Sequence, residues 1–331
     1  MCYNYFAYVT EQNTCWDGEA MNSTFKTKYH RSLTLKAAWY YYIDNLTQQQ
    51  IADILDISRM KVVKLIDKAK EEHIVQFDFP TISSSQIALE NGLIRKYHLK
   101  DALVVPSSGK ANQITSVASA AAMYLNDRIH GESYINLGYG ETVSHVINEL
   151  AAIASKTVSF ISLTGGVTPY LPQNTTTRFN ANLYIIPSPI IMSSPNLAQA
   201  MLTEPDIQQI LRMNKLAQYT VISVGGVDSN ATAVQENLIS ANDFMGLKMS
   251  GAQGDILLHF FNQDGKQIES QINDRLVGIS IKELKELNNV VGVAAGESKV
   301  EAIRAALKGG YLDIIITDEA TAANILEDKE E

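Results

Sequence analysis

The chain has 331 residues, of which 46% are hydrophobic and 19% are charged. This composition excludes a disordered, collagen-like or low-complexity chain, and the length predicts about two domains at roughly 150 residues per domain. The formal net charge of −9 argues against nonspecific binding of nucleic acid by the chain as a whole. Both cysteines, Cys2 and Cys15, lie at the N-terminus, which excludes a disulfide framework and a cysteine-based metal site elsewhere.

The N-terminal residues are not expected to form a signal peptide. Residues 1–10 lack the basic and apolar regions of a signal peptide, and no run approaches the roughly 18 uninterrupted apolar residues of a membrane helix. We therefore expect a cytoplasmic protein with no membrane partner, no metal and no cofactor.

The charge is distributed unevenly along the chain. Residues 24–79 hold 9 Lys or Arg and 7 Asp or Glu, whereas residues 80–331 hold 18 Lys or Arg and 26 Asp or Glu. A weakly basic segment therefore precedes a large acidic one, so contact with nucleic acid is expected only through the smaller segment. On charge alone, random surface variation explains the asymmetry equally well.

Residues 1–23 show neither a helical nor a strand period, and we expect a tail. Met21 follows Gly-Glu-Ala, and Gly-Glu can be encoded by a purine-rich stretch that resembles a bacterial ribosome-binding site. We therefore hypothesise that translation starts at Met21, which the intact mass of the native protein would test. The expected domains are residues 24–79 and residues 80–331.

Residues 33–79 have helical periodicity, with helices expected over 33–44, 48–55 and 59–72. Thr47 and Gln50 have the spacing of a capping box, and Ser58 is a second N-cap. Small Ala52 permits close approach of two helices, and Asp56 is one of the few residues that tolerate a left-handed turn. This pattern predicts a helix-turn-helix.

The start of the helix 59–72 presents a basic outer face. In a helix-turn-helix these positions meet base edges and phosphates in the major groove. Arg59 suits a guanine edge, and Lys61 and Lys64 suit phosphates. The candidate DNA-binding residues are Ser58, Arg59, Met60, Lys61 and Lys64. The alternative is a helical hairpin with a solvated charged face.

After residue 80, short β-rich runs alternate with helical stretches, which predicts α/β units and a mostly parallel sheet. The expected strands cover residues 102–105, 134–137, 158–163, 184–186, 220–224, 256–261, 290–294 and 314–317. The expected helices cover residues 114–126, 142–154, 206–218, 281–287, 299–308 and 319–327.

Several of these strands end in glycine. The candidate ligand-binding residues of the first two strand ends are Gly138, Gly140, Glu141, Thr142, Thr164, Gly165 and Gly166. Such loops can place backbone N–H groups and a helix N-terminus around an anion, although tight strand–helix turns also use glycine for steric reasons. Ligands of open α/β sheets bind at the carboxyl ends of strands, so we expect one small anionic or polyhydroxyl ligand here.

Two charged residues are further candidates. Asp255 could accept sugar hydroxyls, or it could cap a turn. Lys299 lies where a strand end meets a helix start and could pair with a phosphate, or it could be a solvated first-turn lysine. The histidines show no metal-ligand spacing, and no Ser-His-Asp or Cys-His arrangement is present.

Over residues 30–328 the chain resembles the SorC-type, DeoR-like sugar-binding transcriptional regulators. The resemblance is carried by the helix-turn-helix and by blocks that include Leu-Gly-Tyr-Gly-Glu-Thr at 137–142, Gly-Ala-Gln-Gly-Asp at 251–255, Asn-Asp-Arg at 273–275 and Ala-Gly-Glu-Ser-Lys at 295–299. It implies a Rossmann-like effector and oligomerisation domain similar to sugar-phosphate isomerases, and a homo-oligomer, typically a tetramer, that binds operator DNA and a sugar or phosphosugar effector.

By the same resemblance, the glycine loops form the effector site, Asp255 faces sugar hydroxyls and Lys299 supports the phosphate or polar end of the ligand. Glu141 departs from relatives that carry a basic residue in the first loop, which favours hydroxyls over a bisphosphate. The leading interpretation is a non-enzymatic regulator of a carbohydrate-utilisation operon. The alternatives are a sugar-phosphate isomerase or deaminase that uses Glu141 and Asp255, and a pure interaction module.

Overall fold

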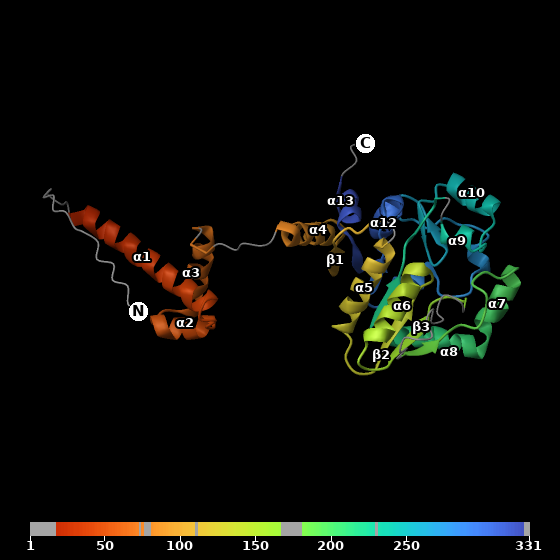
Figure 1. Cartoon of the computed structure of the whole chain (residues 1–331), viewed down its shortest axis with the longest axis horizontal. Helices are drawn as coiled ribbons and strands as arrows, with labels where there is room; N and C mark the ends of the chain where they lie inside the picture. The colour runs from red at the N-terminus through yellow and green to blue at the C-terminus, as the bar shows by residue number, and fades with distance from the viewer. Residues whose placement is uncertain are drawn as a thin grey trace. The chain divides into compact units, whose positions relative to one another are not determined.

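The computed structural model describes residues 18–72, 74–75, 81–109, 112–166, 181–228 and 231–327. Two compact units make up the chain, Met1–Pro80 and Thr81–Glu331 (Figure 1). The first is helical and the second is an α/β unit. Among the described residues, no helix is long and apolar enough to cross a membrane.

The first unit consists of α1 (Gly18–Tyr42), α2 (Gln48–Leu55) and α3 (Arg59–Glu71). Its core is a cluster of buried side chains: Leu33, Ala37, Ile51, Ala52, Val62, Leu65 and Ile66. The expected start of the first helix was wrong, because α1 begins at Gly18 rather than at residue 33. Residues 18–23 are therefore helical, whereas the rest of the expected tail lies outside the described residues.

The connection between α2 and α3 confirms the predicted local geometry. Thr47 and Gln50 form the capping box of α2, and the Ser58 side chain caps α3. Asp56 between them is left-handed, with φ 49° and ψ 50°. Val62 and Ala52 are both buried in the core of this unit, so the two helices are held in contact.

The second unit is built on a seven-stranded parallel sheet with the order β1-β10-β9-β5-β2-β3-β4. The strands are β1 (Asp101–Val105), β2 (Ser133–Leu137), β3 (Val158–Ser162), β4 (Ala181–Tyr184), β5 (Tyr219–Ile222), β9 (Val290–Val293) and β10 (Ile314–Asp318). The prediction of a mostly parallel sheet is therefore confirmed. From β2 the chain proceeds outward to β3 and β4 and then returns to β5 on the other side of β2, so the direction of the connections switches between β2 and β5.

Helices cover both faces of this sheet. The second unit contains the helices α4 (Thr81–Tyr97), α5 (Gln113–Asn126), α6 (Glu141–Ile153), α7 (Pro195–Thr203), α8 (Pro205–Met213), α9 (Thr232–Gln235), α10 (Ala241–Met249), α11 (Ile281–Leu284), α12 (Val300–Lys308) and α13 (Glu319–Leu326). Ile314 and Ile316 of β10 pack in the cluster that contains α5 and α6, which lie side by side (Figure 1). Ile315 packs in the opposite cluster, with α4, α12 and α13.

A small antiparallel sheet is inserted in the chain between β5 and β9. It consists of β6 (Gly225–Gly226), β7 (Gly254–Ile256) and β8 (His259–Phe261). The expected single strand over 256–261 was wrong. Leu257 and Leu258 adopt positive φ values of 55° and 65°, so the chain reverses there into a hairpin. Its Phe260 packs against Phe244 of α10 in a separate apolar cluster.

Other element boundaries also differ from the expectations. The helix expected over 206–218 ends at Met213 and continues as a short 3₁₀ turn, Asn214–Leu216. The expected helix 281–287 ends at Leu284. The sequence patterns did not predict α4, α7, α9 or α10. For α7, the signal is the Ser194 N-cap followed by Pro195 at the first helical position.

Candidate functional site

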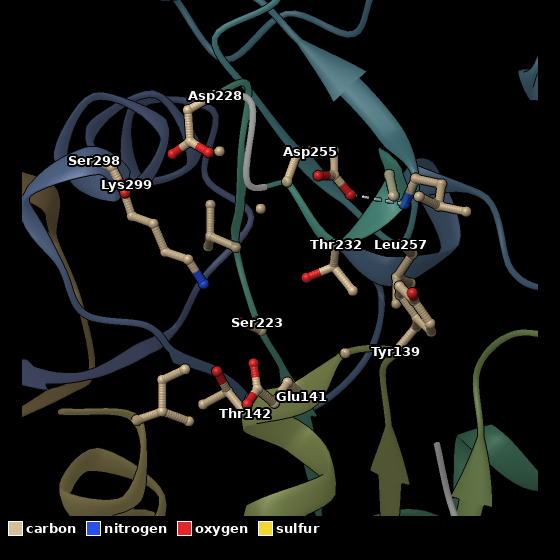
Figure 2. A pocket seen from close by; sticks show the side chains of 18 residues that line it. Tyr139, Glu141, Thr142, Ser223, Asp228, Thr232, Asp255, Leu257, Ser298 and Lys299 are labelled. Atoms are coloured by element: carbon tan, nitrogen blue, oxygen red, sulfur yellow. Dashed lines mark hydrogen bonds between the residues drawn. The ribbon is translucent and has the colours of Figure 1, made fainter. Parts of the chain in front are cut away.

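A cavity of about 200 Å³ lies where the strand connections switch direction, beyond the carboxyl ends of β2 and β5. This is the position at which open parallel sheets bind ligands. Figure 2 shows the side chains that surround it. The polar side chains of the lining are Tyr139, Glu141, Thr142, Ser223, Asp228, Thr232, Asp255, Ser298 and Lys299.

The first wall is the N-terminus of α6. Gly140 precedes the helix with φ 125°, a conformation that L side chains rarely adopt, and so requires glycine. Glu141 and Thr142 then open the helix toward the cavity, with Thr142 only 4% exposed. Unpaired N–H groups of a first helical turn favour a negative partner, so this wall offers hydrogen-bond donors together with one carboxylate.

Asp255 of β7 forms the opposite wall. Its Oδ2 accepts a hydrogen bond of 3.0 Å from the Leu258 N–H, and its Oδ1 lies against Gly225, where an added Cβ would be 2.0 Å away. Burial raises the pKa of Asp255 to about 6, although the Leu258 hydrogen bond and the Lys299 charge both lower it. The hairpin turn thus fixes the carboxylate, and the two-residue turn itself requires the positive φ values of Leu257 and Leu258.

Lys299 enters the cavity from the start of α12. Burial lowers the pKa of its ammonium group, while the charges of Asp255, Glu141 and Asp228 raise it. In Figure 2 the side chain extends inward between Asp228 and the pair Glu141 and Thr142. One cation is therefore surrounded by three carboxylates.

The structure brings five of the predicted ligand-binding residues together in this lining: Gly140, Glu141, Thr142, Asp255 and Lys299. Gly138 does not line the cavity, because a Cβ at this position would lie 3.0 Å from both Ile222 and Leu257. The absence of a side chain at Gly138 therefore allows Ile222 and Leu257 to pack against its backbone.

The second predicted loop also lies outside this lining. The Gly165 N–H donates to the Val277 carbonyl and the Gly166 N–H to the Ser188 carbonyl. Thr164 forms an isolated bridge with Gly278 and is 3% exposed. These hydrogen bonds connect the loop to neighbouring chain segments. The geometry does not support a role in effector binding for Thr164, Gly165 and Gly166.

Sequence reasoning missed five polar residues of the lining: Tyr139, Ser223, Asp228, Thr232 and Ser298. Ser223 directly follows β5, and Asp228 follows the Gly225–Gly226 strand, so their position at strand ends was the signal that could have found them. Tyr139 donates a hydrogen bond to Glu236, which ties the first glycine loop to the segment after α9. Among the described residues, no group of three or more His, Cys, Asp or Glu side chains could hold a metal ion.

The predicted DNA-binding residues lie together on the first turns of α3. Ser58, Arg59, Met60, Lys61 and Lys64 are all exposed. Arg59 contacts Gln48 of α2 through a hydrogen bond of 3.4 Å, and the Ser58 hydroxyl accepts the Lys61 N–H. The same helix buries Val62, Leu65 and Ile66, so its basic face is opposite its apolar face.

The chain resembles known proteins over most of its length. Residues 83–327 match the family described as "Putative sugar-binding domain". The transcriptional regulator LsrR of Klebsiella pneumoniae is 30% identical over 298 residues, 89% of this chain and 92% of that protein. LsrR of Escherichia coli K12 is 31% identical over 295 residues, which cover 88% of this chain and 93% of that protein.

Solved structures show the same fold. The full-length sorbitol operon regulator SorC from Klebsiella pneumoniae superposes with a TM-score of 0.66 at 21% identity, over 89% of this chain and 98% of that one. A DeoR family transcriptional regulator from Listeria monocytogenes gives a TM-score of 0.65 at 26% identity, over 73% of this chain and 99% of that one.

Proposed function

This chain belongs to the SorC-type family of sugar-binding transcriptional regulators, and we propose that it regulates a carbohydrate-utilisation operon by binding operator DNA and a small carbohydrate effector. The observation that carries the proposal is the cavity at the switch point of the sheet, lined by hydroxyls, carboxylates and one lysine. The same chain carries a capped helix pair with a basic exposed face.

The helix pair α2 and α3 is the proposed DNA-binding helix-turn-helix. Its left-handed Asp56 turn and its buried Ala52 and Val62 give the close helix contact that this motif requires. The exposed Arg59 and Lys64 then lie on the helix that enters the major groove. Reading the two half-sites of an operator requires at least two copies, and we propose a homo-oligomer, a tetramer as in the family.

The cavity is the proposed effector site. Carboxylates such as Asp255 accept pairs of sugar hydroxyls, whereas Lys299 and the Thr142 hydroxyl donate to ring and chain oxygens. Its volume of about 200 Å³ suits one small molecule. A regulator with this arrangement acts in the cytoplasm, where its operator is.

One observation favours a second function. A carboxyl group whose pKa is raised to about 6, as for Asp255, can exchange protons near neutral pH. With Glu141 across the cavity, it would suit a sugar-phosphate isomerase or deaminase. Incubation of the protein with sugar phosphates, followed by mass spectrometric and NMR analysis of the products, tests this alternative. Turnover that Asp255→Asn abolishes would establish an enzyme.

A mobility-shift assay with the DNA upstream of its own gene tests the regulator. We expect a specific shift that a carbohydrate changes, and a weaker shift for Lys64→Ala. Lys70→Ala is the matched control, because Lys70 is an exposed lysine at the far end of the same helix. The proposal is overturned if promoter and unrelated DNA bind equally, or if no carbohydrate changes the shift.

A further inference from the structure

Asp318 is a buried carboxylate that lies behind the cavity rather than in its lining. It is the last residue of β10 and the N-cap of α13, and it is 1% exposed. Its Oδ1 accepts a hydrogen bond of 2.8 Å from the Thr321 N–H, which is the usual bond of a helix cap. Its Oδ2 accepts a hydrogen bond from the side-chain amide of Gln113, which lies 205 positions earlier in the sequence. Capping of α13 therefore accounts for only one of the two carboxylate oxygens.

Gln113 connects this carboxylate to the start of α5. It is the first residue of that helix, and the next residue, Ile114, lines the cavity. While its Nε2 donates to Asp318, its Oε1 lies beside Gly296, where an added Cβ would be 3.2 Å away. One amide group thus contacts both the end of β10 and the loop that leads to Lys299.

Thr321 connects the same carboxylate to that loop from the other side. Its side chain is 1% exposed, and its hydroxyl accepts a hydrogen bond of 2.9 Å from the Gly296 N–H. The Gly296 carbonyl in turn accepts the Lys299 N–H at 3.0 Å. These two bonds hold the short 3₁₀ turn Glu297–Lys299, from which Lys299 enters the cavity.

Burial makes these hydrogen bonds depend on one another. A buried donor or acceptor that loses its partner costs more free energy than an exposed one, because water cannot replace the partner. If Gln113 no longer donated, Oδ2 of Asp318 would be left unpaired at 1% exposure. The carboxylate would then have to turn, which would also disturb its bond to Thr321 and the loop that Thr321 holds.

Resting on the proposed effector site, we propose that Asp318 and Gln113 are positioning residues for effector binding. Neither lines the cavity. Together with Thr321 they fix the loop 295–299 against the start of α5, and they thereby set where Lys299 and Ile114 face the cavity. The effector meets a site that is already ordered, so its affinity is not reduced by the cost of ordering this loop.

The test changes the hydrogen-bonding pair in the full-length protein. Gln113→Glu places a second carboxylate against Asp318, whereas Gln113→Glu/Asp318→Asn restores a hydrogen bond with donor and acceptor exchanged, and asparagine still caps α13. Calorimetry near neutral pH uses a panel of pentoses and hexoses, each as the free sugar and as its monophosphate. For the compounds that the wild type binds, we expect Gln113→Glu to bind at least about tenfold more weakly and the double variant to bind within about threefold of the wild type. Gln209→Glu makes the same change at an exposed position of α8 and should leave the affinity unchanged.

Amide hydrogen exchange of the ligand-free protein separates positioning from overall stability. In Gln113→Glu the N–H groups of Gly296 and Lys299 should exchange at least about tenfold faster, and the double variant should restore their wild-type rates. Exchange in the helices of the first unit should not change. Thr321→Val is a second variant, which removes the hydroxyl that accepts the Gly296 N–H but keeps the backbone N–H that Asp318 caps. It should weaken binding by about fivefold.

Three results would overturn this inference. They are wild-type affinity in Gln113→Glu or in Thr321→Val, unchanged exchange at Gly296 and Lys299 in Gln113→Glu, and a double variant that binds as weakly as Gln113→Glu. If Gln113→Glu does not fold, Thr321→Val decides alone. If the wild type binds no compound of the panel, the proposed effector site fails and this inference fails with it, whereas loss of binding without rescue overturns only the positioning role.

Discussion

Replacing Gly225 with alanine probes the geometry that holds Asp255 in the cavity. A methyl group on Gly225 would lie 2.0 Å from Asp255 Oδ1 and 2.9 Å from its Cγ. Gly225 and Asp255 are directly paired across β6 and β7, so neither strand can slide to make room. The carboxylate must therefore rotate away from the Leu258 N–H, to which its Oδ2 is now bonded at 3.0 Å.

The expected cost follows from these two contacts. A hydrogen bond to a charged group contributes about 1.5–3 kcal/mol, and an added methyl in a packed site costs about 1–3 kcal/mol. Because movement of the carboxylate relieves part of the clash, we expect Gly225→Ala to lower the free energy of unfolding by about 2–4 kcal/mol. In a domain of this size each kcal/mol shifts the Tm by roughly 2–4 °C, so the Tm falls by roughly 4–16 °C.

Thermal unfolding of the full chain, followed by circular dichroism, measures this change. Gly246→Ala is the control: Gly246 is exposed within α10, nothing lies within 4 Å of an added Cβ, and alanine there should stabilise by about 0.5–1 kcal/mol. In the double variant Gly225→Ala/Asp255→Ala the clash is absent. Its loss of unfolding free energy should therefore be at least about 1 kcal/mol smaller than the sum of the losses in the two single variants. A wild-type Tm for Gly225→Ala, or additive losses, would refute the reasoning.

Three further predictions concern DNA, pH and the core of the first unit. Arg59→Ala should relax operator sequence preference at a cost of about 1–3 kcal/mol, and Lys64→Ala should weaken binding to all sequences and flatten its salt dependence, both measured by fluorescence anisotropy. Because protonation of Asp255 removes an acceptor for sugar hydroxyls, effector affinity should fall as pH drops through about 6, by up to about tenfold at pH 5, and calorimetry should show no such fall in Asp255→Asn. Val62→Ala should destabilise the first unit by about 1–3 kcal/mol in urea unfolding, since Val62 is fully buried, and a loss below about 0.5 kcal/mol would contradict that packing.

Local chemistry made the α2–α3 connection predictable. The capping box of Thr47 and Gln50 and the left-handed Asp56 depend on interactions within a few residues, so the sequence specifies them directly. The start of α1 depends on no such signal. Residues 18–32 lack a helical apolar period, so the sequence offered no basis for placing this helix start at Gly18.

The hairpin at Leu257 and Leu258 shows a different limit. Leucine gives no local signal for two successive residues with positive φ, and the run from 256 to 261 therefore resembled one strand. The reversal is accompanied by one local hydrogen bond and one tertiary contact. It directs the Leu258 N–H to Asp255 and packs Leu257 into the space left by the missing side chain of Gly138.

The sequence predicted where the candidate site lies in the sheet, but it did not predict which charged side chains line the cavity. Gly138 and Gly140 are both glycines and lie two residues apart. Packing requires glycine at position 138, whereas the φ of 125° requires it at position 140. No spacing rule distinguishes these two roles. The glycine-rich strand ends therefore indicated the edge of the sheet where the cavity lies and included residues that do not line it.

The charged side chains of the cavity come together only when the sheet is assembled. Glu141, Asp228, Asp255 and Lys299 are separated by as many as 158 positions in the sequence, and each alone is an ordinary first-turn or turn residue. The order that places β5 between β2 and β9 brings them around one cavity, where three carboxylates share one ammonium group. This grouping of charges is a property of no single motif.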